Sequence, residues 1–143
     1  MRIILAVSGL LACNSGHIVD AYTAAQCVAF TQHPTENRTR EWETKIVLPN
    51  GEDVIVNGAN RISNVVASYP STKEKVIVAA PGDYVYPLDV RYDPQNGVLY
   101  TLADGLAGGI GRRTELFAFD LVHRHQLGRR RVDRSNLPPI CPD

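Results

Sequence analysis

The chain has 143 residues and a mass of 15.7 kDa, a length that suits one domain. Hydrophobic residues make up 44% and charged residues 21% of the sequence, which predicts a packed core and argues against wholesale disorder. The 15 Lys and Arg residues balance the 15 Asp and Glu residues, and this zero net charge argues against a dedicated nucleic-acid-binding protein.

The first residues have the pattern of an export signal. Arg2 precedes an apolar stretch over residues 3–12, in which Ser8 is the one polar residue, and the stretch ends abruptly at Asn14. One positive charge followed by a short apolar segment is typical of a secretory signal peptide, so we expect residues 1–12 to be a signal peptide. The alternative is a buried first strand or short helix.

The sequence LLAC at residues 10–13 resembles the lipobox of bacterial lipoproteins, in which the cysteine receives a lipid and becomes the first mature residue. The resemblance implies lipidation at Cys13. Asn14 after the cysteine implies a periplasmic protein attached to the outer membrane by its lipid. The alternative is a secreted soluble protein that is cut after Ala25.

The cysteine count suggests a disulfide. The chain has three cysteines, at positions 13, 27 and 141, and an odd number leaves one thiol over in an exported protein. If Cys13 carries a lipid, Cys27 and Cys141 remain as a pair near the two ends of the mature chain, where termini often meet. We therefore expect a disulfide between them, the alternative being two unrelated buried thiols.

The mature chain divides into an N-terminal segment over residues 13–40 and a single β domain over residues 41–143. The stretch 14–26 is small, polar and Ala-rich, which indicates a tether or a short helix. Asn50-Gly51 between two apolar runs is a strong hairpin signal. Four hairpin-like pairs are expected, namely 45–48 with 53–56, 62–67 with 75–80, 88–92 with 98–102, and 115–121 with 126–132. The fold class is therefore mainly β, with antiparallel sheets built of hairpins.

The segments NGVLYTLADG (residues 96–105) and TELFAFDLVHRHQLG (residues 114–128) resemble one four-stranded blade of a β-propeller. A closed propeller needs at least ~4 blades of ~40 residues, which the length of this chain excludes. The resemblance leaves two architectures open. One is a pair of propeller-blade-like sheets, and the other is a single curved antiparallel sheet.

A glycine-rich segment over residues 103–113 is expected to be a long loop between two strands. Four glycines make such a loop costly to order, and a loop that only connects could be shorter, so we expect it to contact a partner. Leu106 and Ile110 would be its apolar contacts. The alternatives are a plain connection and a phosphate-binding loop, although the latter requires a helix to follow. The candidate partner-binding residues are Asp104, Gly105, Leu106, Ala107, Gly108, Gly109, Ile110, Gly111, Arg112 and Arg113.

Signatures of catalysis are missing from the sequence. There is no Gly-x-Ser-x-Gly, no His-Glu-x-x-His and no Walker loop, so we expect no enzymatic activity and no cofactor. His123 and His125 could form half of a metal site, but a solvated basic turn is the preferred interpretation, and no metal site is expected. Turn chemistry is the interpretation given to four aspartates, Asp83, Asp89, Asp93 and Asp104.

These patterns predict an exported, lipid-anchored β-protein that binds a protein partner. Small periplasmic lipoproteins with incomplete propeller-like folds are similar in outline to immunity proteins that plug cell-wall amidases delivered by type VI secretion. This analogy implies an inhibitor of a cell-wall amidase or another periplasmic hydrolase, with no nucleic-acid partner. The alternatives are an accessory or structural envelope lipoprotein and, third, a small hydrolase that uses scattered acids.

Overall fold

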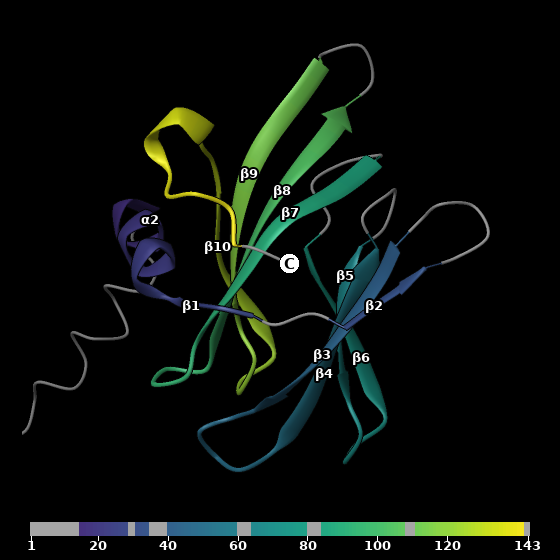
Figure 1. Cartoon of the computed structure of the whole chain (residues 1–143). Helices are drawn as coiled ribbons and strands as arrows, with labels where there is room; N and C mark the ends of the chain where they lie inside the picture. The colour runs from purple at the N-terminus through teal and green to yellow at the C-terminus, as the bar shows by residue number, and fades with distance from the viewer. Residues whose placement is uncertain are drawn as a thin grey trace, which may run out of the picture.

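Two antiparallel five-stranded sheets that face one another form the body of the protein (Figure 1). This computed structural model describes residues 15–28, 31–34, 40–59, 64–79, 84–107 and 111–141. The mainly β fold class is thereby confirmed, together with its antiparallel hairpins and short N-terminal helix. The expected signal peptide and the lipidation site Cys13 lie outside the described residues.

Sheet B, the first of the two sheets, follows the chain without a crossover. Its strand order is β2-β3-β4-β5-β6. The strands are β2 (Thr31–Pro34), β3 (Arg40–Val47), β4 (Asp53–Ala59), β5 (Val65–Tyr69) and β6 (Glu74–Ala79).

Sheet A is a second run of consecutive hairpins with one early strand added at its edge. Its order is β1-β7-β8-β9-β10. The chain therefore enters sheet A briefly, builds sheet B and then returns. The strands are β1 (Gln26–Cys27), β7 (Tyr84–Asp93), β8 (Val98–Ala107), β9 (Gly111–Asp120) and β10 (His125–Arg131).

Local chemistry accounts for the predicted hairpins. At the β3–β4 turn Gly51 has a φ of +87°, which glycine adopts without strain, and the Asn50 side chain accepts a hydrogen bond from the Glu52 N–H at 3.0 Å. Gly97 has a φ of +69° in the β7–β8 turn. All four predicted strand pairs are present, and most of their strands extend beyond the predicted bounds.

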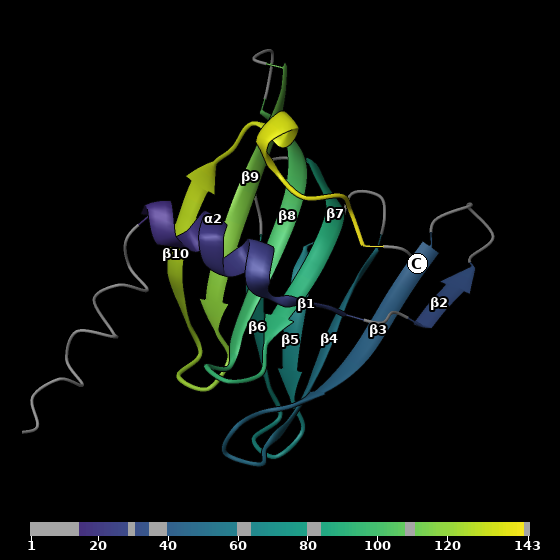
Figure 2. The same cartoon turned by 60° about the vertical axis from the view of Figure 1, so that its left-hand side comes forward.

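The segment predicted to be a tether or a short helix forms helix α2 (Ser15–Ala24), which lies across the outer face of sheet A (Figure 2). Ile18 and Tyr22, one helical turn apart, are 3% and 0% exposed and pack against that face. No helix in the described part of the chain is long and apolar enough to cross a membrane.

Sheet A is consequently buried on both faces. Val98, Tyr100 and Leu102 pack with the helix, whereas Leu99 and Phe117 belong to the core between the two sheets. This double burial explains why the sequences of β8 and β9 have almost continuous apolar runs instead of strict alternation.

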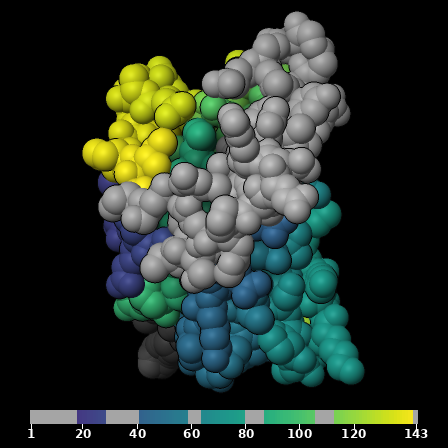
Figure 3. All heavy atoms as spheres, turned by 45° about the vertical axis from the view of Figure 1, so that its right-hand side comes forward, coloured from purple at the N-terminus to yellow at the C-terminus, as the bar shows by residue number. Residues whose placement is uncertain are grey.

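Beyond β10, the short 3-10 helix η1 (Arg134–Asn136) leads the chain back toward α2. Figure 3 shows this C-terminal segment (yellow) and the N-terminal helix (purple) along one side, with sheet B (blue and teal) on the other.

Candidate functional site

The predicted partner-binding segment lies at the end of a long hairpin and not in a long loop. β8 continues to Ala107 and β9 begins at Gly111, and these two residues are the last paired positions. The expectation of a loop over residues 103–113 is therefore wrong. Gly105 stays in the sheet because β8 lies between two strands at this position, opposite Val85 of β7 and Arg113 of β9. Gly108, Gly109 and Ile110 lie outside the described residues, as do the side chains of Leu106 and Arg112.

The hairpin extends past the end of its neighbour β10. The pairing of β10 with β9 ends at Arg131 and Glu115, so the first residues of β9 have no β10 partner, apart from a bond of 3.0 Å between the Val132 N–H and the Thr114 carbonyl. Figures 1 and 2 show the end of the β8–β9 hairpin reaching beyond β10 and beyond sheet B. An overhanging hairpin on a rigid sheet is a suitable element for contacting a partner.

Buried polar side chains fix the base of this hairpin. The Thr114 hydroxyl donates to Asp104 Oδ1 at 2.7 Å, and an Arg134 guanidinium nitrogen lies 3.8 Å from Asp104 Oδ2. One strand position further, Glu115 receives a hydrogen bond from Arg129 of β10 at 2.9 Å. The base of the hairpin is therefore held from both neighbouring segments, whereas nearer its end only β8 keeps a neighbour, because β7 pairs with it as far as Leu106.

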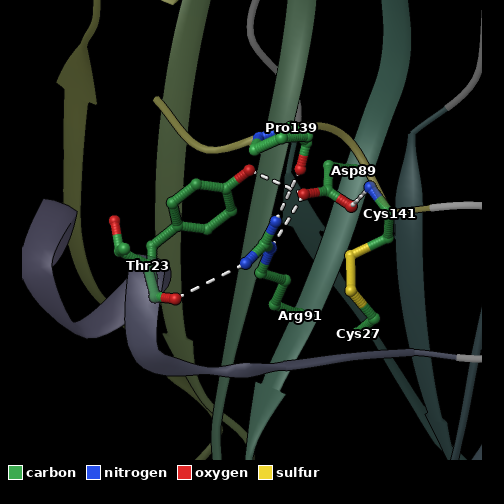
Figure 4. The surroundings of a disulfide bond; sticks show 7 residues. Thr23, Cys27, Asp89, Arg91, Pro139 and Cys141 are labelled. Carbon is green, nitrogen blue, oxygen red and sulfur yellow. Dashed lines mark hydrogen bonds and ion pairs between the residues drawn. A yellow bond between two sulfur atoms is a disulfide. The ribbon is translucent and has the colours of Figure 1, made fainter. Parts of the chain in front are cut away.

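The second notable cluster joins the two ends of the described chain (Figure 4). Cys27 of β1 and Cys141 near the C-terminus form a disulfide with a Cα–Cα distance of 5.8 Å, as the cysteine count predicts. The Cys141 N–H also donates to Asp89 Oδ1 at 3.3 Å. The disulfide therefore lies against a charged residue of β7.

Asp89 forms a buried ion pair with Arg91 beneath the helix. The side chains of Arg91 and Asp89 are 8% and 0% exposed, and Arg91 Nε donates to Asp89 Oδ2 at 2.9 Å. The Tyr22 hydroxyl donates to the same oxygen at 2.6 Å, and a second Arg91 nitrogen donates to the Pro139 carbonyl at 2.8 Å. Burial, and then the contact with Asp89, raises the pKa of Tyr22 well above its usual range. Helix, sheet and C-terminal segment thus meet at one satisfied polar network.

A third cluster closes the opposite end of the molecule, where the hairpin turns of the two sheets meet. Arg124, in the β9–β10 turn, donates to Glu52 at 2.9 Å and also to Glu74, and its guanidinium carbon lies 3.9 Å from the centre of the Tyr69 ring. The Tyr69 hydroxyl donates to the Leu121 carbonyl at 2.7 Å. Burial raises the pKa of Tyr69 to about 12. Arg124 therefore connects the sheets.

The prediction that four aspartates stabilise turns is correct for Asp93 and wrong for two others. In the β7–β8 turn, the Asp93 carboxylate accepts hydrogen bonds from the backbone N–H groups of Gln95 and Asn96. For Asp89 and Asp104 the prediction is wrong, because both are buried in strands and bound to side chains. Asp83 lies outside the described residues.

The two histidines lie where a turn meets a strand. His123 belongs to the β9–β10 turn, with its ring 2.8 Å from Asp120, and His125 begins β10. Arg124, between the two histidines, is partly buried against Tyr69. For this residue the predicted solvated turn is therefore wrong. In the described part of the chain no group of three or more His, Cys, Asp and Glu residues could hold a metal ion.

The ion pair of Asp89 and Arg91 is the feature that the sequence analysis missed. The two residues alternate with Val90 and Tyr92, which belong to the core between the sheets, so the two charges share the opposite face of the strand. Opposite charges two residues apart in such a strand are a signal of a paired polar site. The sequence does not reveal the third and fourth members, Tyr22 and Cys141, because they are far away along the chain.

Comparison with protein-family models finds no match, and comparisons with curated proteins and with solved structures find no significant match either.

Proposed function

We propose that the protein is exported, carries a lipid at Cys13 and binds a protein partner without catalysing a reaction. The Cys27–Cys141 disulfide supports export, because disulfides persist in oxidising compartments and are rare in the cytosol. The end of the β8–β9 hairpin supports binding, and its extension past β10 is the observation on which the proposed function rests.

The position of α2 supports processing at Cys13 over cleavage after Ala25. Cleavage after Ala25 would remove Ile18 and Tyr22, both buried against sheet A, and would expose the apolar face that they cover. It would also take away the hydroxyl that donates to Asp89. Processing at Cys13 retains the whole helix.

The most specific form of the proposal is an inhibitor of a cell-wall hydrolase. The part of sheet A that extends past β10 consists of the ends of β7, β8 and β9, and such a projecting edge fits the concave active site of a hydrolase better than a flat surface would, because it can enter a cleft.

A shortened hairpin tests this role. Replacing residues 107–111 with Asn-Gly makes Leu106 and Arg112 flank a two-residue turn and keeps the contact between Asp104 and Thr114. A larger deletion that starts at residue 104 would remove that contact, and a loss of binding could then result from misfolding. The matched control is Ile77→Thr, on the exposed face of sheet B.

The tagged full chain is expressed in its host, and envelope proteins cross-linked to it are quantified by mass spectrometry. We expect the parent and the control to capture a cell-wall hydrolase, and the shortened variant to capture about tenfold less, equivalent to ~1.4 kcal/mol. Equal capture by the shortened variant would contradict the role of the hairpin. Capture without any hydrolase would favour an accessory envelope protein.

A further inference from the structure

Among the described residues, the seam between the two sheets has no strand along one side. β2 pairs with β3 only from Arg40 to Glu43, whereas β4 pairs with β3 as far as Val47. Beyond Glu43, no described strand occupies the edge of β3 that faces away from β4. A hollow of about 300 Å³ lies there, and we call it the β1–β3 slot. It is lined by residues 26–28 on one side, residues 44–47 on the other, and Tyr92.

Main-chain groups from both walls point into the slot. Successive residues of a strand direct their N–H and C=O groups to opposite sides. The Leu48 N–H donates to Glu52 on the β4 side, so the main-chain groups of Val47 and Lys45 face the slot. On the opposite wall the Val28 N–H donates to Val90 of β7, so the groups of Cys27 face the slot as well.

The side chains around the slot are mostly apolar. Val28 and Ile46 are buried at its walls, and Val47, at 60% exposure, is one of the large exposed hydrophobic residues of the described chain. Lys45 is the one charged residue in the lining, and its amine is 3.1 Å from Asp53. Tyr92 is buried, and its hydroxyl has no hydrogen-bond partner among the described residues. The slot thus offers apolar walls and main-chain groups that no described strand pairs.

We propose that the β1–β3 slot binds an extended, uncharged, apolar peptide segment of a protein partner, which adds as a strand between β1 and β3. A single extended peptide has hydrogen-bonding groups along both edges, and the slot has unpaired groups on both walls. The edge strand of a folded second copy does not fit, because its other edge is joined to the rest of its own sheet. The site is separate from the β8–β9 hairpin.

Amide hydrogen exchange provides the test. The probes are nine-residue peptides selected from a random phage library on the disulfide-intact protein, each compared with a version N-methylated at alternate residues. We expect the selected peptides to slow exchange at Cys27, Lys45 and Val47 by about tenfold or more, and the N-methylated versions to lose this effect. The proposal is overturned if no peptide is selected, if protection appears only elsewhere, or if N-methylation changes nothing.

Two variants at one position form a matched pair. Lys45→Pro removes an N–H that faces the slot and makes no bond to β4, so proline is tolerable there as at a strand edge, whereas Lys45→Ala keeps the N–H. We expect the proline variant to bind peptide about tenfold more weakly and the alanine variant to bind within about twofold of the parent. Equal binding by both variants contradicts main-chain pairing. If the proline variant does not fold, the N-methylated peptides decide the question. Peptide binding by the variant with the shortened hairpin separates this proposal from the inhibitor role.

Discussion

The buried ion pair beneath the helix gives the sharpest test of the packing. Asp89→Asn keeps the size of the side chain but removes its charge, and leaves the guanidinium of Arg91 buried without a counter-ion. Breaking a buried pair in this way typically costs about 3 to 5 kcal/mol, because the remaining charge has already lost its water. We expect a loss of that size in the free energy of unfolding. It would be a large share of the roughly 5–15 kcal/mol of a typical domain.

Tryptophan fluorescence can follow the unfolding of this protein, and a surface ion pair provides a control variant. Trp42 is the single tryptophan and is buried in the core between the sheets, so its fluorescence in a urea titration follows global unfolding. The matched control is Asp53→Asn, which breaks the surface ion pair with Lys45, where the side chains are 46% and 63% exposed. We expect the control to cost under about 1 kcal/mol.

A double variant separates the charge effect from packing. Asp89→Asn combined with Arg91→Met leaves no unpaired charge, so we expect it to cost less than the sum of the two single changes. If Asp89→Asn costs no more than the surface control, or if the two changes are additive, then the pair is not buried as described and the packing of α2 on sheet A is wrong.

Three further perturbations probe other parts of the fold. Replacing Cys27 and Cys141 by Ser opens a loop of 114 residues, and we expect the free energy of unfolding to fall by up to about 5 kcal/mol in urea titrations. Burial raises the pKa of both Tyr69 and Tyr100 to about 12, so the folded state holds these protons longer than the unfolded state does. The contribution of these two protonated tyrosines to the free energy of unfolding is complete below pH 10 and is lost as the pH rises from 10 to 12. The urea midpoint should therefore fall over that range, and it should fall less in Tyr100→Phe. Gly58→Ala would place a Cβ 2.7 Å from the indole of the tryptophan and should lower the thermal midpoint, at a cost of about 1–3 kcal/mol; an unchanged midpoint would contradict the close approach.

The hairpins could be predicted because their signals are local. Asn50-Gly51 imposes the β3–β4 turn through backbone geometry, and apolar runs on both sides supply the strands. The two short strands β1 and β2 could not be found in this way, because two and four residues are too few to show a period. They form because neighbouring strands offer free edges.

The glycine-rich segment shows where composition misleads. Glycines such as Gly105 indicate a loop when read alone, but β8 lies between two partners and its ladder continues through Gly105. Likewise, Asp89 and Asp104 have the polarity of turn residues, and only the tertiary structure supplies their partners, Arg91 and Thr114. The disulfide could be predicted because, once Cys13 is assigned to lipidation, only Cys27 and Cys141 remain to form a pair.

The proposed export and lipid anchoring of this disulfide-linked chain can be measured together. The most direct measurement is the non-reduced mass of the protein purified from the envelope of its host, followed by peptide mapping. We expect a mature chain that begins at a lipid-modified Cys13 and contains Cys27 joined to Cys141. A chain that keeps residues 1–12 and has two freely alkylated thiols would contradict the account.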